Sequence, residues 1–340
     1  MISIKENISL KQYNTFNIDV NAAHFCCVQT LDELKYLIHN KLHHFSRYLF
    51  IGGGSNILFC SAFDGLVILN KIKGIEISKE DEQHVWIKAN SGTTWHDLVL
   101  FAVSNNFGGI ENMSLIPGTV GAAPMQNIGA YGVELKDVFE QLTAIDIGNA
   151  TMQIFNKEAC AFGYRESIFK RQLKDKFFIY SVTLKLSKHP VINSAYGDIQ
   201  KVLEAKNIHT PNIQDISDAV IFIRQSKLPD PNVLGNAGSF FKNPEVESSI
   251  VTELTQQYPT MPKYNLPNGH FKIPAAWLIE QCGWKGKRIG NTGNHSKQAL
   301  VIVNYGNAKG HEIWQHAQNV QQTVKKKFGI HLEMEVNQIQ

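Results

Sequence analysis

The residues best suited to contact a phosphate group lie in the glycine-rich segment Gly52–Asn56. This segment directly follows the apolar run Tyr48–Ile51, which is typical of a buried strand. Without β-carbons, successive backbone N–H groups can approach an anion and surround it. The segment is not the dinucleotide fingerprint GxGxxG, because Ile57 stands where the last glycine belongs. Since a glycine run alone is more typical of a tight turn, both interpretations stay open.

A second segment, Ile116–Gly132, is also rich in small residues. It contains four Gly, three Ala and two Pro, so it cannot build a core from large side chains. Such a segment can bring its backbone close to an extended ligand. A buried crossing of two chain segments would have the same composition, and this structural alternative also stays open.

Single side chains suited to proton transfer or charge stabilisation occur further along the chain. Ser239 follows Gly238, which leaves its hydroxyl uncrowded, but the GxSxG nucleophile elbow is absent. A capping or turn serine is the structural alternative. Arg165 follows Tyr164, and a surface ion pair would explain the arginine equally well.

The terminal segment Leu332–Val336 alternates apolar and acidic residues with period two, which predicts a strand. Glu333 and Glu335 would then lie side by side on one face.

Neither a metal site nor a disulfide framework is expected. His311 and His316 are five residues apart on a predicted helix, so their imidazoles point about 140° apart and cannot share a metal. The five cysteines form no CxxC pair, which favours reduced, buried thiols.

The elements that must position these residues follow from periodicity and end signals. Thr30 is suited to cap a helix whose apolar stripe is Leu31, Leu34, Leu37 and Ile38. Helices are also predicted from Trp95 to Asn105 with a stop at Gly108–Gly109, over Ala275–Gln281, and over Ala308–Phe328; further strands are predicted at Leu66–Leu69 and His84–Lys88.

Composition excludes several classes of protein. The 340 residues are 43% hydrophobic and 19% charged, with a net charge of +3, as in ordinary globular proteins. The one basic cluster, Lys325–Lys327, is typical of a solvated helix end rather than of a nucleic-acid site. No apolar run is long enough for a membrane span, and the charged N-terminus lacks a signal-peptide core. We therefore expect a cytoplasmic protein that contacts neither nucleic acid nor membrane.

The motifs together resemble those of the UDP-N-acetylenolpyruvoylglucosamine reductase family, within the wider vanillyl-alcohol-oxidase-like flavoproteins. The two glycine segments match its FAD-binding blocks, with Met125 where valine is common. Further matching blocks follow in family order from Thr15 to Glu335: Asn14–Ile18, Phe162–Ser167, Arg224–Pro231, Gly235–Pro244 and Asn291–Val301. The match at Ser194–Asp198 is shorter.

The resemblance implies an α+β fold with a two-part, PCMH-type FAD-binding domain and an α/β substrate-binding domain. Residues 1–74 would form the first FAD-binding subdomain, joined by a C-terminal strand at 331–340. Residues 75–212 would form the second subdomain, and residues 213–330 the substrate-binding domain.

The implied activity is NADPH-dependent reduction of the enolpyruvyl ether of UDP-N-acetylglucosamine through bound FAD. By resemblance, Ser239 gives a proton while Arg165 and Glu335 flank the substrate carboxylate. Beside a developing dianion, Glu335 is useful only when it carries a proton. The implied FAD-binding residues are Thr15, Gly52, Gly53, Gly54, Ser55, Asn56, Ile116, Pro117, Gly118, Gly121, Ala122, Gln126, Asn127, Gly129 and Tyr131. The implied substrate-binding residues are Tyr164, Tyr196, Arg224, Lys227, Asn243 and Gln298.

Two other functions compete with this one. A flavin oxidase of the same fold often tethers FAD through histidine or cysteine near the glycine loop, and Gly52–Asn56 offers neither. Bound FAD should therefore be non-covalent. A nucleotide-sugar binding module would need the glycine loops but not Ser239 and Glu335 together. A monomer is expected.

Overall fold

The computed structural model describes residues 2–340, which form two compact units. Unit 1 contains the N-terminal segment through Ile8, then Ala22–Gly53 and Asp64–Ser226. Unit 2 contains Ser9–Asn21, Gly54–Phe63 and Lys227–Gln340. Each unit is thus built from segments distant in sequence. The predicted division into two FAD-binding subdomains and a substrate-binding domain, with boundaries at residues 74 and 212, remains a prediction.

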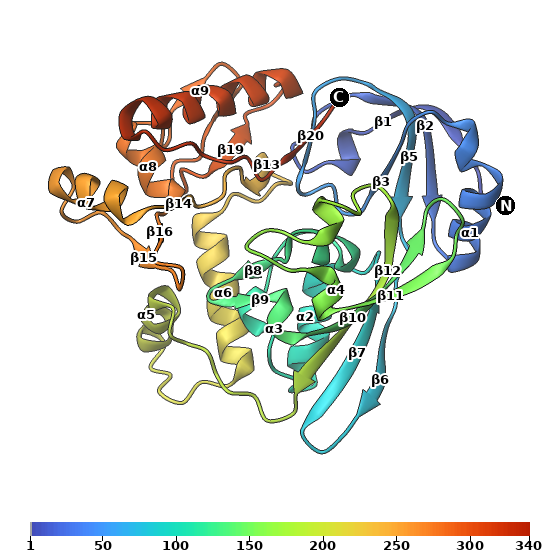
Figure 1. Cartoon of the computed structure of the whole chain (residues 1–340), viewed down its shortest axis with the longest axis horizontal. Helices are drawn as coiled ribbons and strands as arrows, with labels where there is room; N and C mark the ends of the chain where they lie inside the picture. Colours follow the sequence, from blue (N-terminus) through green and yellow to red (C-terminus); the bar gives the residue numbers. More distant parts are fainter. Residues whose placement is uncertain (1) are drawn as a thin grey trace. The chain divides into compact units, whose positions relative to one another are not determined.

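Unit 1 begins with a four-stranded sheet in the order β1-β2-β5-β3 (Figure 1). Its strands are β1 (Lys5–Ser9), β2 (Asn21–Val28), β5 (Phe63–Asn70) and β3 (Tyr48–Ile51). Helix α1 (Leu31–Asn40) is capped by Thr30, whose Oγ1 accepts the Glu33 N–H at 3.1 Å. The helix buries Leu34, Leu37 and Ile38, as its periodicity predicts. The predicted strands at 48–51 and 66–69 are confirmed, and they pair in parallel.

A five-stranded antiparallel sheet forms the second part of unit 1, in the order β11-β10-β12-β7-β6. Its strands are β11 (Met152–Asn156), β10 (Phe139–Asp146), β12 (Phe177–Ser187), β7 (His84–Asn90) and β6 (Ile75–Glu80). Helix α2 (Trp95–Ser104) buries Trp95, Leu98 and Val99 in the same core as this sheet. The helix ends before the predicted stop at Gly108, because Asn106 takes the left-handed conformation with φ 58°.

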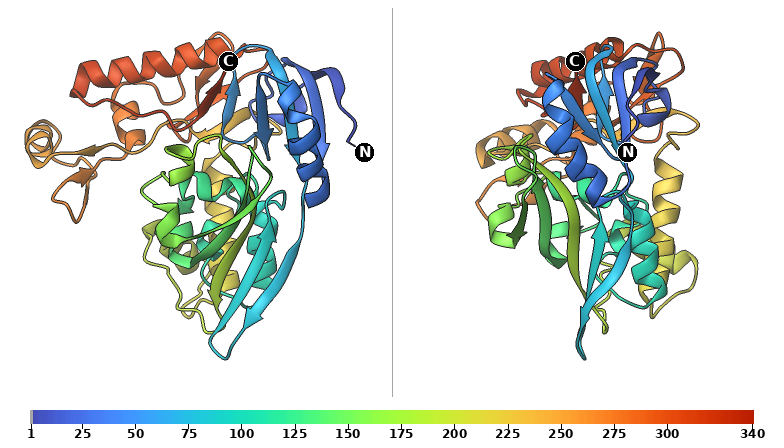
Figure 2. Two further views of the ribbon diagram at one scale, coloured as in Figure 1. Left: turned by 45° about the vertical axis from the view of Figure 1, so that its right-hand side comes forward. Right: turned by 90° about the vertical axis from the view of Figure 1, so that its right-hand side faces the viewer.

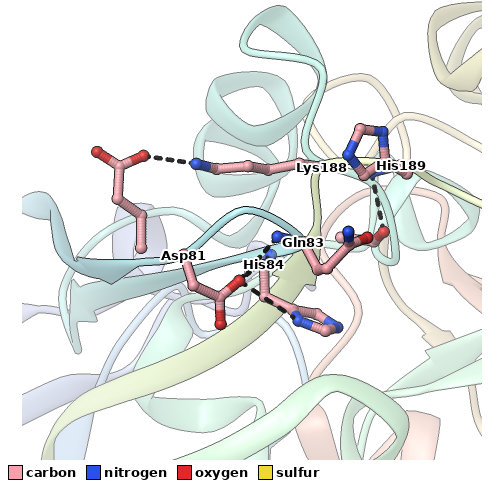
Figure 3. Close-up of polar contacts among 7 residues, drawn as sticks. Asp81, Gln83, His84, Lys188 and His189 are labelled. Carbon is pink, nitrogen blue, oxygen red and sulfur yellow. Dashed lines mark hydrogen bonds and ion pairs between the residues drawn. The ribbon is translucent and has the colours of Figure 1, made fainter.

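The β6–β7 hairpin extends at one end of the sheet (Figure 2). The Asp81 carboxylate closes its turn by accepting the backbone N–H groups of Gln83 at 2.8 Å and His84 at 2.6 Å (Figure 3). These two bonds lower the pKa of Asp81. Lys188, just beyond β12, donates to Glu80 at 2.8 Å. The hairpin is therefore tied to the neighbouring strand at its far end.

Two helices complete unit 1. Helices α5 (Gly197–Ala205) and α6 (Ile213–Lys227) share a small core of Ile199, Leu203, Ile216, Ala219, Val220 and Ile223. The short elements of the unit are β8 (Gly129–Ala130), β9 (Val133–Glu134), α3 (Leu135–Val138), α4 (Lys157–Cys160) and 3₁₀ turns at Leu42–His44, Glu111–Met113, Val120–Ala122, Pro124–Gln126 and Ile168–Lys170.

Unit 2 is centred on an antiparallel sheet in the order β13-β19-β18-β17. Its strands are β13 (Gly235–Ser239), β19 (Val301–Asn304), β18 (Thr292–Asn294) and β17 (Arg288–Ile289). Helices α8 (Ala275–Gln281) and α9 (Gly310–Phe328) match their predicted ranges closely. The other elements are β14 (Glu245–Val246), α7 (Ser248–Gln257), β15 (Tyr264–Asn265), β16 (Phe271–Lys272), a 3₁₀ turn at Lys11–Tyr13, and the parallel pair β4 (Ile57–Phe59) and β20 (Asn337–Ile339).

Of the two histidines on α9 whose spacing resembles a zinc motif, His316 has a structural role. His316 is 2% exposed, and its ring contacts Thr292 Oγ1 at 3.0 Å and Asn294 Oδ1 at 2.8 Å. Burial lowers the pKa of His316 to about 4, so the ring stays neutral. His311, by contrast, is exposed. His316 therefore ties α9 to β18.

The predicted strand at 332–336 is wrong. Only an isolated bridge between Met334 and Phe241 forms there, and the regular strand β20 begins at Asn337. The alternation predicted burial correctly at Leu332 and Val336 and exposure at Glu333. The period-two pattern of residues 332–336 thus belongs to an extended segment that forms one isolated bridge and no regular β-ladder.

Among residues 2–340, no helix is both long and apolar enough to cross a membrane.

Candidate functional site

The two glycine segments meet within unit 1. A β-carbon on Gly52 would overlap the Thr119 side chain, and one on Gly53 would lie 3.2 Å from Gly118 Cα. The segments can therefore approach this closely only because both glycines lack side chains. An anion-binding cradle for a dinucleotide requires such closely packed backbone, so these residues fit FAD.

The start of helix α2 holds the second glycine segment in place. Trp95 N–H donates to Gly118 O at 3.0 Å, and Val120 N–H donates to Thr93 O at 2.9 Å. Gly121 N–H donates to Ser91 O at 2.9 Å. Ile116 and Pro117 precede the hydrogen-bonded residues Gly118–Gly121, and Ala122 follows them.

Asn127 organises the next stretch. Its φ is 43°, its side chain is fully buried, and its Nδ2 donates to Glu134 Oε2 and Gly163 O at 3.0 Å each. Its Oδ1 accepts Lys136 N–H at 3.0 Å. Because its side chain is bonded to protein groups, Asn127 positions the chain around Gly129 rather than offering its amide to a ligand.

Arg165 lies in a tight turn of the same unit. Gly163 and Glu166 exchange backbone hydrogen bonds of 3.0 and 3.3 Å across the turn, and Arg165 takes φ 54°. Its Nη2 donates to Gly129 O at 2.8 Å, and its guanidinium lies 5.6 Å from the Tyr164 ring centre. The turn therefore fixes the guanidinium beside the second glycine segment. Neighbouring Glu166 pairs with Arg171 at 3.1 Å.

Arg224, on α6, lies beside Tyr131 and Tyr196. It forms a hydrogen bond with Tyr131, whose ring meets that of Tyr196 edge-on at 5.3 Å. Burial lowers the pKa of Arg224, and the nearby charge of Arg165 acts in the same direction. Arg224 Nε is buried and has no hydrogen-bond partner among residues 2–340. An acceptor from a ligand would satisfy it.

Thr15 and the end of the first glycine segment lie in unit 2. Thr15 N–H donates to Gly54 O at 3.1 Å, and Thr15 O accepts Asn236 N–H at 2.9 Å. Gly54 has φ 61°, and a β-carbon there would overlap Tyr13 O, so only glycine fits. Asn56 Nδ2 donates to Glu335 O at 3.2 Å, which joins this segment to the terminal one. Ser55 lies between Gly54 and Asn56.

In unit 2 the backbone at Glu335 is hydrogen-bonded to the residue that follows Ser239, although 96 positions separate Ser239 and Glu335 in the sequence (335 − 239). Glu335 N–H donates to Phe240 O at 2.8 Å, the residue after Ser239. Ser239 is exposed at the end of β13, after Gly238 with φ 70°. The carboxylate of Glu333 pairs with Lys242, three residues after Ser239, at 2.5 Å. Glu333 and Glu335 were predicted to lie side by side on one face of a strand. In the structure they have different partners.

The remaining predicted substrate-binding residues, Lys227, Asn243 and Gln298, also lie in unit 2. Asn243 Oδ1 accepts the Ala275 N–H at the start of α8 at 2.9 Å, and Gln298 Oε1 accepts Leu300 N–H at 3.3 Å. Lys227 O accepts a hydrogen bond from His295. Arg224, predicted to bind the substrate with Lys227 and Asn243, lies on α6 within unit 1.

One further polar residue of unit 1 was not predicted. His96 Nδ1 accepts the Leu115 N–H at 3.0 Å, one residue before the second glycine segment. No motif marks this histidine, because it stands among ordinary residues of an amphipathic helix.

Comparison with known proteins identifies the class first. Residues 22–156 match the family model described as FAD binding domain, and residues 230–339 match that of the UDP-N-acetylenolpyruvoylglucosamine reductase C-terminal domain. The whole chain also superposes on UDP-N-acetylenolpyruvylglucosamine reductase from Thermus caldophilus, with a TM-score of 0.69, 22% identity and full coverage of both chains. The fold is therefore that of an FAD-binding oxidoreductase, and the predicted fold class is confirmed.

The particular family follows from closer relatives. The chain is 52% identical to UDP-N-acetylenolpyruvoylglucosamine reductase of Amoebophilus asiaticus, over 100% of both chains. It is 51% identical to the reductase of that name in Flavobacterium johnsoniae, over 99% of this chain and 100% of the relative. The chain belongs to the UDP-N-acetylenolpyruvoylglucosamine reductase family. The competing interpretations, another flavin oxidase of the same fold and a nucleotide-sugar binding module, are thereby set aside.

The packing of the two glycine segments generates a prediction. Gly52→Ala should weaken FAD binding roughly tenfold, the equivalent of about 1.4 kcal/mol, because the new methyl group pushes Thr119 away. Adding Thr119→Ala should restore most of the affinity, since it removes the side-chain atoms that the new methyl group would meet. Titration of apoprotein with FAD, followed by flavin fluorescence, measures both effects.

Gly197→Ala is the matched control, because nothing lies within 4 Å of its added β-carbon. Unchanged FAD affinity in Gly52→Ala, or no recovery in the double variant, would show that this packing does not shape the cofactor site.

Proposed function

We propose that this protein reduces UDP-N-acetyl-3-O-(1-carboxyvinyl)-glucosamine to UDP-N-acetylmuramate, with NADPH as co-substrate and FAD bound non-covalently. The product would serve peptidoglycan precursor synthesis in the cytoplasm. The observation that carries the proposal is the backbone link between the Ser239 and Glu335 segments, through the Glu335 N–H to Phe240 O bond. Family membership supports the substrate, because the relatives' names specify this reduction.

The chemistry of the substrate defines what the protein must provide. Its enol ether is conjugated to a carboxylate, so hydride addition at the terminal carbon places negative charge on the neighbouring carbon and the carboxylate. FAD held by the glycine segments and reduced by NADPH would supply this hydride. The polypeptide must then stabilise the charge and deliver one proton to the neighbouring carbon.

Ser239 suits the delivery of that proton. A hydroxyl is a weak acid, so it protonates only a strongly basic carbanion-like centre. The C–H bond forms as the Ser239 O–H bond breaks, and the resulting alkoxide must recover a proton. Ser239 is exposed, which supports proton recovery from water.

Arg165 and Glu335 suit the control of charge at the carboxylate. The Arg165 guanidinium is oriented by Gly129 O, and its permanent positive charge suits an anion. Glu335 acts as a protonated hydrogen-bond donor in this proposal. Glu333 is less suited, because its carboxylate is held in an ion pair with Lys242.

The remaining polar residues suit the UDP-sugar. Lys227 and Asn243 provide charge and an amide for the phosphates and uridine, together with Gln298. Tyr164 and Tyr196 provide aromatic contacts from unit 1, where Arg224 is a further anion-binding group. NADPH and the UDP-sugar would bind alternately, and the protein would act as a monomer.

Ser239→Ala should separate the two half-reactions. Flavin reduction by NADPH should keep its rate, because that step needs no proton from Ser239. Reoxidation by the UDP-enolpyruvyl sugar should slow by about 10²–10⁴-fold, the usual contribution of a positioned acid. Anaerobic stopped-flow absorbance measures each rate separately. Equal slowing of both half-reactions would make Ser239 a structural residue.

Glu335→Gln should lower the rate of substrate reduction by about a hundredfold or more. Because the proposal has Glu335 act in its protonated form, any decline of the wild-type rate at high pH that depends on this carboxyl group should be absent in the variant. Rate against pH, measured for substrate reduction alone, tests both effects. Glu333→Gln is the matched control and should keep the wild-type pH profile. Full activity in Glu335→Gln would exclude proton transfer by this residue.

A further inference from the structure

Leu115 has an unusual backbone conformation. Its φ is 58°, in the left-handed region that a residue with a branched side chain rarely adopts. It directly precedes Ile116, at the entry to the second glycine segment. A left-handed leucine persists only where its surroundings hold it. The contacts of its N–H group therefore determine how the chain enters the FAD-binding segment.

The Leu115 N–H donates to His96 Nδ1 at 3.0 Å. A backbone N–H can only donate, so Nδ1 carries a lone pair and the neutral ring holds its proton on Nε2. His96 is the second residue of α2, directly after Trp95, whose N–H binds Gly118 O and whose Nε1 donates to Met113 O at 3.1 Å. Neighbouring residues of one helix thus hold the segment before and after Ile116–Pro117.

We propose that His96 is a positioning residue for FAD: its neutral Nδ1 holds Leu115 in the left-handed conformation that sets the Ile116–Gly121 segment for the cofactor. The inference rests on FAD binding by this family and not on the proposed reaction. Failure of the substrate chemistry would therefore leave it intact.

Protonation of His96 would break this contact, since both ring nitrogens of imidazolium are donors. Two charged groups act on the ring: Asp97 on its own helix and Arg224 from α6. Burial lowers the pKa of His96 below its ordinary value of 6.5; Arg224 adds to this, and Asp97 opposes it. The N-terminal end of α2 also disfavours a cation there. FAD affinity should therefore be constant at neutral pH and fall only in acid.

Asparagine provides the sharpest test, because its Oδ1 occupies nearly the place of Nδ1 and does not titrate. His96→Leu should bind FAD about tenfold more weakly than wild type at neutral pH. His96→Asn should stay within about threefold of wild type. On acidification, affinity should fall for wild type and stay level for His96→Asn. FAD titration monitored by flavin fluorescence gives the affinity of each protein at each pH.

A second readout needs no cofactor. In the apoprotein, hydrogen exchange at the Leu115 amide should be faster in His96→Leu than in wild type or His96→Asn. If His96→Leu does not fold, His96→Gln replaces it, since its amide reaches the Nε2 position and cannot accept from Leu115. Equal FAD affinity in wild type and the non-accepting variant would overturn the proposal. So would equal weakening in His96→Asn, or an acid-induced loss that persists in it.

Discussion

The close approach of two backbone segments in unit 1 is the constraint on which the proposed cofactor site depends. A β-carbon on Gly53 would lie only 3.2 Å from Gly118 Cα, and one on Gly52 would overlap the Thr119 side chain, so glycine at both positions permits this close approach. The second segment is held there by the start of α2 through Trp95, His96 and Thr93. Helix α2 packs in the core of the five-stranded sheet and thereby holds the second glycine segment, which has few large side chains of its own.

Conformations that disfavour ordinary side chains recur around this site. Leu115, Asn127, Tyr131 and Arg165 all have positive φ values, and each lies in or beside the second glycine segment or the turn that contacts it. Such conformations are retained where hydrogen bonds over-determine them. His96 holds Leu115, and Gly129 O orients Arg165, so the strained backbone places both the cofactor segment and the guanidinium.

Much of this could be predicted from the sequence, because the signals were local. The Thr30 cap, the apolar stripe of α1 and the range of α8 follow from spacing within a single turn or two. The small residues of Gly52–Gly54 and Ile116–Gly132 marked the ligand loops, and the resemblance selected Ser239, Arg165 and Glu335. The backbone link between the Ser239 and Glu335 segments is a long-range contact that periodicity cannot report.

The errors have the same origin. Alternation at Leu332–Val336 predicted a strand, but hydrogen-bond partners depend on distant segments, and only Met334 forms a bridge. The hydrogen bond between Arg224 and Tyr131 is likewise a long-range contact, which the sequence pattern does not report. His96 escaped notice because its role depends on Leu115, 19 positions away.

The central claim is that one bound flavin accepts electrons from NADPH and passes them to an enolpyruvyl UDP-sugar. Anaerobic mixing of the purified protein with stoichiometric NADPH, followed by the UDP-enolpyruvyl sugar, tests this directly. The account predicts loss of the yellow colour with NADPH, its return with the sugar, and formation of one UDP-N-acetylmuramate per flavin. A reduced flavin that persists with the sugar and is reoxidised only by oxygen would contradict it.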